Sequence, residues 1–167
     1  MRRKRKTLRS KHEFLIRRAT QTDLLMMIHQ YRRMWEDIGF KESSSLDEAE
    51  RSYRKWAKVQ FKNETLLGWI VETRDHVVAG GGCIWLRPAL PRPNLPELDE
   101  PFLVSMFTEP EFRRSGIASK VVEESIKWCR RKGYRRILLH ASKKGRGLYR
   151  KYGFTRTWEM RLEVTNK

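Results

Sequence analysis

The chain has 167 residues, 39% hydrophobic, which is long enough for one domain with a sizeable core and too apolar for general disorder. No apolar run approaches the roughly 20 residues that a membrane-spanning helix needs, so we expect a soluble protein. The net charge of +17 is uneven, with +8 on residues 1–20, −4 on residues 21–112 and +13 on residues 113–167.

Residues 1–12 contain seven basic side chains and almost no apolar ones, which predicts a solvated basic tail ahead of a single domain over residues 13–167. The tail lacks the apolar core of a secretory signal and the spacing of a transit peptide. Two interpretations stay open for it: a weak contact with nucleic acid, a ribosome or another anionic surface, and an extension without a function of its own.

The first half of the domain predicts a strand at 14–18 followed by two helices. An apolar stripe from Leu24 to Ile38 predicts a helix that ends near Gly39. The S-x-x-E pattern that starts at Ser45 is a capping box, which predicts a second helix that begins there and runs to about residue 61.

The middle of the chain predicts an antiparallel strand pair at 67–73 and 77–86. Glycines at 80–82 interrupt the second strand, and such glycines often mark a bulge or a close approach of another backbone. The segment 87–101 contains five prolines and predicts a loop that borders an acceptor site.

A strand at 101–108 leads into the basic turn 113–118, RRSGIA, and an amphipathic helix follows as far as Gly133. The first backbone N–H groups of such a helix have no partner inside the helix, so an anion placed there gains hydrogen bonds and a favourable dipole. Gly116 allows a phosphate to approach the backbone closely, and the two arginines of the turn add charge.

Residues 135–140 predict a short buried strand, parallel to strand 101–108 because a helix crosses between the two. A last helix is predicted at 143–152 and a terminal strand at 158–164.

This order of motifs resembles the GNAT superfamily of acetyl-CoA-dependent N-acetyltransferases. The superfamily's pyrophosphate loop has the pattern Arg/Gln-x-x-Gly-x-Gly/Ala. Arg113, Gly116 and Ala118 match this pattern. Its later motif, LY, three residues, GF, is matched by Leu148, Tyr149, Gly153 and Phe154. The resemblance covers roughly residues 14–164. It implies a mixed α/β, GNAT-like fold: a central, mostly antiparallel sheet with one parallel strand pair splayed around the cofactor, flanked by about four helices.

The resemblance also implies acetyl-CoA as the cofactor, no metal, and these cofactor-binding residues: Met106, Phe107, Thr108, Arg113, Arg114, Ser115, Gly116, Ile117, Ala118, Ser142 and Tyr149. Ser142 stands where many members have an asparagine, so its hydroxyl replaces only one of the amide's hydrogen bonds. Tyr149 is the implied catalytic residue, because a phenol with a pKa of about 10 can protonate a leaving thiolate. The alternative for Tyr149 is a packed aromatic side chain without a catalytic role.

The sequence does not identify the general base. The candidates near predicted strand ends are Glu72, Ser105, Glu109 and His140, and ordered water serves instead in some relatives. By resemblance, residues 31–56 help to choose the acceptor. Their candidates, which are equally compatible with core aromatics and solvated acids, are Tyr31, Trp35, Glu36 and Asp37.

These features predict an N-acetyltransferase that moves the acetyl group of acetyl-CoA to a primary amine, in a small molecule, a protein N-terminus or a lysine, by direct attack in a ternary complex. The basic third of the chain suits a polyphosphate cofactor and the acidic middle suits a cationic amine. The alternatives are a basic nucleic-acid or ribosome-associated binding protein and a non-catalytic CoA-binding relative. Cys83 and Cys129 lack metal-ligand spacing and predict buried free thiols in a reducing, cytoplasmic compartment. A homodimer stays open.

Overall fold

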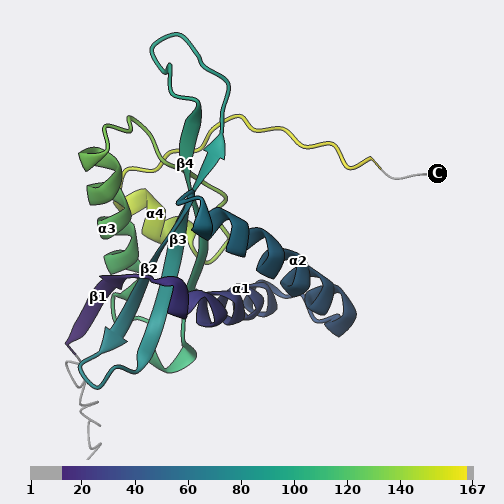
Figure 1. The fold of residues 1–167 in the computed structure, drawn as a ribbon, viewed down its shortest axis with the longest axis vertical. Helices are drawn as coiled ribbons and strands as arrows, with labels where there is room; N and C mark the ends of the chain where they lie inside the picture. The colour runs from purple at the N-terminus through teal and green to yellow at the C-terminus, as the bar shows by residue number, and fades with distance from the viewer. Residues whose placement is uncertain (1–12, 165–167) are drawn as a thin grey trace, which may run out of the picture.

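Five strands form one mixed sheet in the order β1-β2-β3-β4-β5 in the computed structural model of the chain, which describes residues 13–164 (Figure 1). The predicted basic tail lies outside the described residues. In chain order the elements are β1 (Phe14–Arg18), η1 (Gln21–Asp23), α1 (Leu24–Ile38), α2 (Ser43–Lys62), β2 (Leu66–Thr73), β3 (Val78–Pro88), β4 (Asp99–Thr108), η2 (Pro110–Phe112), α3 (Ile117–Arg131), β5 (Leu138–Leu139) and α4 (Arg146–Lys151).

The helices cover both faces of the sheet, with α3 and α4 on one face and α1 and α2 on the other (Figure 1). Successive side chains of a strand point to opposite faces, and β2 follows this rule. Leu67, Trp69 and Val71 pack into the core under α3, whereas Leu66 and Ile70 pack into the core under α1 and α2. The sheet therefore separates two apolar cores.

The strand pairs are antiparallel except for β4 and β5, which are parallel, as predicted. The parallel pairing covers only Phe102 with Leu138 and Leu103 with Leu139. Beyond it, β4 has a bulge opposite β3, where Ser105 adopts a positive φ of 54°. A bulge bends its strand, so β4 turns away from β5. This explains why β5 has two residues and not the six predicted at 135–140.

The glycines at 80–82 allow β3 to approach its neighbours at this bulge. A Cβ atom on Gly80 would lie 2.5 Å from the carbonyl oxygen of Phe107, and one on Gly81 would lie 2.7 Å from that of Trp69. Both distances are shorter than any ordinary contact, so the predicted close approach is confirmed.

Helix ends confirm the sequence analysis in part. Gly39 and Gly133 follow α1 and α3 with φ values of 118° and 81°, the left-handed conformation that glycine favours. The prediction of a capping box at Ser45 is wrong. α2 begins two residues earlier, and the Ser45 hydroxyl donates to the Glu42 carboxylate at 2.8 Å. α4 begins at Arg146, later than predicted, because the chain first makes a turn at Ser142.

The predicted strand at 158–164 does not form. This segment runs past the sheet without pairing to any described strand (Figure 1). A strand needs a neighbour for its backbone hydrogen bonds, and no described strand pairs with this segment. Within residues 13–164, no helix combines the length and the apolar composition that crossing a membrane requires.

Candidate active site

The basic turn forms the connection between β4 and α3. Arg114 and Gly116 have φ values of 64° and 86°, and alternation of such left-handed residues with ordinary ones directs backbone N–H groups toward a common point. Gly116 precedes the 15-residue helix α3, and no side chain caps this end. The free N–H groups and the helix dipole thus make this turn favourable for an anion.

Two guanidinium groups flank this turn. Arg113 donates through Nε to the carbonyl oxygen of Thr108 at 3.2 Å and forms an ion pair with Asp37 at the end of α1. Arg114 is exposed and forms no ion pair with any side chain in the described part of the chain. The turn therefore presents one tethered and one free cation.

One edge of β4 is open next to the turn. β5 pairs with β4 only as far as Leu103, so residues 104–108 have β3 on one side and no described strand on the other. Unpaired backbone groups on such an edge can bind an extended ligand as an additional strand. The predicted pantetheine residues Met106, Phe107 and Thr108 lie on this segment.

Tyr149 lies on α4 and packs against the same core as Ile117 and Met106. Its ring meets the ring of Phe154 edge-on, with 5.8 Å between the centroids. Burial raises the pKa of the phenol above its ordinary value. The hydroxyl makes no hydrogen bond to any residue among 13–164, so its proton is available to a ligand.

Ser142 and Lys144 lie in the turn before α4. The Ser142 hydroxyl accepts a hydrogen bond from the Gly145 N–H at 3.2 Å, which leaves its own proton to donate. Lys144 Nζ donates to the carbonyl oxygen of Asp37 at 3.3 Å. Because Asp37 also pairs with Arg113, the end of α1 joins the two sequence motifs. Sequence reasoning placed Asp37 on the acceptor side and did not consider Lys144.

The aromatic acceptor candidates form a packed cluster. Tyr31 stacks on Tyr53 with 3.8 Å between the ring centroids, and Trp35 meets Tyr31 edge-on at 6.1 Å. The Tyr53 hydroxyl lies 3.1 Å from the hydroxyl of Ser105 at the bulge of β4. The cluster therefore ties α1 and α2 to the strand edge, and Glu36 pairs instead with Arg32 at 3.1 Å.

Three of the four base candidates have partners. Glu72 is buried between Arg17 and His76, at 3.2 Å and 3.1 Å. Ser105 bonds Tyr53, and His140 Nε2 lies 2.9 Å from Glu159. The side chain of Glu109 makes no hydrogen bond or ion pair to a residue in the described range, and it follows β4 directly, before the basic turn.

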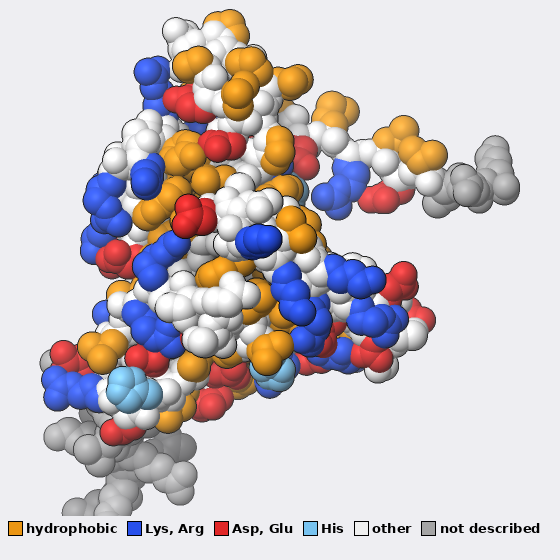
Figure 2. Space-filling model, in the orientation of Figure 1, with side chains coloured by type: hydrophobic (Ala, Val, Ile, Leu, Met, Phe, Trp, Pro, Cys, Tyr) orange, Lys and Arg blue, Asp and Glu red, His pale blue; other side chains and the backbone are white. Residues whose placement is uncertain are grey.

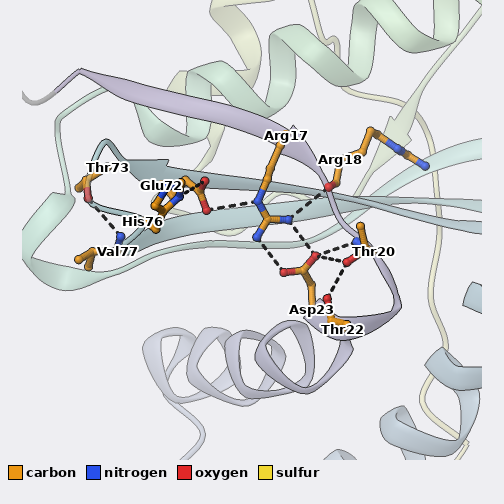
Figure 3. Close-up of polar contacts among 9 residues, drawn as sticks. All are labelled: Arg17, Arg18, Thr20, Thr22, Asp23, Glu72, Thr73, His76 and Val77. Carbon is orange, nitrogen blue, oxygen red and sulfur yellow. Dashed lines mark hydrogen bonds and ion pairs between the residues drawn. The ribbon is translucent and has the colours of Figure 1, made fainter.

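Arg17 connects the start of α1 to the sheet (Figure 3). Its guanidinium forms two hydrogen bonds to Asp23, at 2.8 Å and 2.9 Å, and a third to Glu72 on β2. Hydrogen bonds from Arg17 are the main reason that the pKa of Asp23 falls to about 2. Asp23 also accepts from the backbone and side chain of Thr20. The start of α1 is thus fixed to the sheet, and its end carries Asp37.

Comparison with known proteins agrees with this geometry. The family described as acetyltransferase (GNAT) matches residues 26–154, a range that includes both motifs. None of the curated proteins matches the sequence significantly.

Solved structures show the same fold. A GCN5-related N-acetyltransferase from Ralstonia eutropha has a TM-score of 0.83 at 20% identity, over 91% of this chain and 99% of its own. A predicted acetyltransferase with acetyl-CoA from Clostridium acetobutylicum has a TM-score of 0.80 at 25% identity, over 92% and 96%. The aminoglycoside acetyltransferase AAC(6')-Iy, in complex with a bisubstrate analog of CoA, has a TM-score of 0.66 at 18% identity, over 93% and 99%. Because the family match spans more than half of the chain, this protein belongs to the GNAT family of acetyltransferases.

Proposed function

We propose that this protein is an N-acetyltransferase that moves the acetyl group of acetyl-CoA to a primary amine by direct attack in a ternary complex. The observation that carries the proposal is the turn before α3, where left-handed Arg114 and Gly116 precede an uncapped helix end. Such a concavity favours phosphate oxygens, and the open edge of β4 begins beside it. The Clostridium structure contains acetyl-CoA on the same fold.

The residues of the site fit this cofactor. Arg113–Ala118 would hold the pyrophosphate through backbone N–H groups and the two guanidiniums. Residues 106–108 would hold the pantetheine arm by main-chain hydrogen bonds, and Ser142 would donate one hydrogen bond from its hydroxyl. Acetyl-CoA supplies an acetyl group activated as a thioester. An N–H of the β4 edge would stabilise the negative charge that develops on the acetyl oxygen.

Proton transfers complete the chemistry. An alkyl ammonium has a pKa near 10, as lysine has, so the acceptor must lose a proton before its nitrogen can attack. We assign the role of the base that accepts this proton to ordered water or to Glu109, the base candidate without a partner among the described residues. The amine nitrogen would form the N–C bond, the C–S bond would break, and the sulfur would take its proton from Tyr149 Oη. The nitrogen would then lose its second proton, and return of a proton to Tyr149 Oη through solvent would restore the phenol. Burial keeps this phenol protonated at neutral pH.

The acceptor is a primary amine of a small molecule, a protein N-terminus or a lysine. The −4 charge of residues 21–112 supports a cationic acceptor.

The test is a screen of these three amine classes with acetyl-CoA, read as release of free thiol. Tyr149→Phe should lower kcat roughly 100-fold or more, with acetyl-CoA affinity within about twofold of wild type, because the ring packing is kept. Tyr152→Phe is the matched control, since Tyr152 lies on the same turn but bonds Glu123 at 2.6 Å, and it should keep its kcat.

An unchanged kcat in Tyr149→Phe would show that Tyr149 is not the proton donor. Calorimetric binding of acetyl-CoA without turnover of any amine would identify a non-catalytic CoA-binding protein. Absence of acetyl-CoA binding would overturn the proposal.

A further inference from the structure

The C-terminal end of α3 and the turn that follows it form a basic patch. The patch comprises residues 127–136, KWCRRKGYRR, which contain six cations and no acid. Three of the cations, Arg130, Arg131 and Lys132, are exposed and form no ion pair with any side chain in the described part of the chain. Figure 2 shows Lys and Arg side chains along the flank that α3 forms, on the left of the view.

The remaining cations of the patch are held by neighbours. Lys127 pairs with Glu124 at 2.6 Å, and Arg136 pairs with the buried carboxylate of Glu100 at 2.6 Å. Arg135 Nη1 donates at 2.8 Å to a backbone carbonyl oxygen of the loop between β3 and β4, a neutral partner that leaves the charge of the guanidinium in place. Four of the six cations therefore have no counter-charge among the described residues.

The proposed phosphate site does not account for these charges. The turn 113–118 lies at the start of α3, whereas the patch lies at its other end. A helix of 15 residues with a rise of about 1.5 Å per residue is roughly 22 Å long. The phosphates of CoA belong to a single nucleotide, so one CoA molecule does not place phosphates at both ends of α3. The patch is therefore available to a second polyanion.

The chemistry of the patch favours a nucleic-acid backbone over a protein or a lipid surface. The buried centre of a protein interface is depleted in charged residues, and stable membrane anchoring combines cations with an apolar anchor. None of the apolar side chains in 127–136 is exposed. The phosphates of a nucleic-acid duplex, in contrast, have enough charge density to bind a protein through its cations alone.

The aromatic rings of the patch are not free to stack on bases. Trp128 and Tyr134 stack on each other with 5.8 Å between the ring centroids, and Trp128 meets Trp69 of the core edge-on at 6.5 Å. The Tyr134 hydroxyl donates to Asp99 at 2.8 Å. Single strands bind largely by stacking of their bases on aromatic side chains, so the patch suits a duplex. The same contacts fix the turn after α3 to the core and hold its cations in place.

We propose that the basic patch at the end of α3 binds double-stranded nucleic acid through the phosphate backbone, without sequence preference. Arg130, Arg131 and Lys132 contact phosphates, and Arg135 adds its charge from the turn. The contact leaves the turn before α3 open, so a duplex and acetyl-CoA bind at the same time. The proposal does not rest on the acetyltransferase activity.

Fluorescence anisotropy with short labelled duplexes of DNA and of RNA tests the proposal on the full chain. The triple variant Arg130→Gln/Arg131→Gln/Lys132→Gln removes the three free cations. Its affinity for a duplex should fall roughly 10-fold or more at about 0.1 M salt, and the slope of log K against log salt should fall by roughly 2–3, about one for each lost contact. Wild type should bind a duplex more tightly than a single strand of the same length.

The matched control removes the same number of charges from the other face of the sheet. Lys55, Lys58 and Lys62 are exposed on α2 and form no ion pair within residues 13–164. The triple variant Lys55→Gln/Lys58→Gln/Lys62→Gln should keep its duplex affinity within about threefold of wild type. Equal losses in the two triple variants would show that net charge alone drives binding, and would overturn the proposal.

Acetyl-CoA distinguishes the two ends of α3. A saturating concentration should leave duplex affinity within about twofold of its value without the cofactor. Displacement of the duplex by acetyl-CoA would place the nucleic acid at the turn before α3 and would overturn the proposal. Tighter binding of a single strand than of a duplex would overturn it as well.

Discussion

The guanidinium of Arg113 forms an ion pair with the carboxylate of Asp37, 76 residues earlier in the chain. One partner lies in the turn before α3 and the other at the end of α1, where Lys144 Nζ also donates a hydrogen bond to the main-chain carbonyl of Asp37. The pair orders Arg113, but it places a negative charge beside the proposed site for phosphates. A polyphosphate ligand bound at this turn would therefore compete with Asp37 for the same guanidinium.

Asp37→Asn should bind acetyl-CoA about 2–5-fold more tightly than wild type, because the competing charge is gone and an exposed ion pair contributes little to stability. Isothermal titration at low salt measures the change. The control is Glu36→Gln, which removes a neighbouring carboxylate that pairs with Arg32 and Arg33 and not with the turn. Weaker binding by Asp37→Asn would show that the pair positions Arg113 for the ligand.

Gly116→Ala tests the left-handed turn. Nothing lies within 4 Å of a Cβ at this position, so the cost is conformational, about 1–2 kcal/mol of unfolding free energy. We expect acetyl-CoA binding to weaken as well, roughly tenfold, because relaxation of φ would redirect the N–H groups of the turn.

Gly133→Ala is the matched control for this change. Gly133 also has a positive φ and open space around its Cβ, but it lies at the other end of α3. It should lose the same stability in chemical denaturation and keep its affinity for acetyl-CoA. Equal affinity losses in both variants would mean that stability, and not the turn, controls binding.

The ion pair of Arg17 and Asp23 makes stability depend on pH. The pKa of Asp23 falls to about 2 in the folded protein, against about 3.9 in an unfolded chain. The stabilisation is therefore complete above about pH 4 and is lost as the pH falls toward 2. Asp23→Asn should lower the unfolding free energy by about 1–2 kcal/mol at pH 7, with allowance for the partial exposure of Arg17.

Urea denaturation from pH 7 to pH 2 measures the difference in unfolding free energy between wild type and Asp23→Asn. This difference should shrink between about pH 4 and pH 2. Glu13→Gln serves as the control, because Glu13 and Arg74 form an ion pair whose side chains are 61% and 71% exposed. It should change stability by less than about 0.5 kcal/mol. A difference for Asp23→Asn that does not depend on pH would contradict the assignment.

Both cysteines should be unreactive toward thiol reagents in the native protein. Cys83 and Cys129 are buried free thiols, as predicted, and burial raises the pKa of each to about 12. Since the thiolate is the reactive form, a thiol reagent at pH 8 should label neither cysteine until the chain is unfolded. The assay of thiol release from CoA then has no protein background. Rapid labelling of the folded protein would show that one of the two cores opens, the core under α3 for Cys129 or the core under α1 and α2 for Cys83.

Local rules of chain geometry determined much of this protein from its sequence. Gly39 and Gly133 end helices because a left-handed residue needs no tertiary partner. The glycine run 80–82 indicates a close approach, because a Cβ atom at Gly80 or Gly81 would collide with a neighbouring backbone carbonyl. The order of the basic turn and the later tyrosine motif was enough to indicate the family, which the match over residues 26–154 confirms.

Contacts between distant segments were decided by the tertiary structure alone. The bonds of Asp37 to Arg113 and of Tyr53 to Ser105 join residues 76 and 52 positions apart, and no local periodicity encodes them. The bulge at Ser105 shortened β5, and the segment 158–164 has a strand pattern without forming a strand. A strand depends on its neighbour for every backbone hydrogen bond. Alternation in a sequence therefore indicates a capacity to pair, and only the tertiary structure supplies the partner.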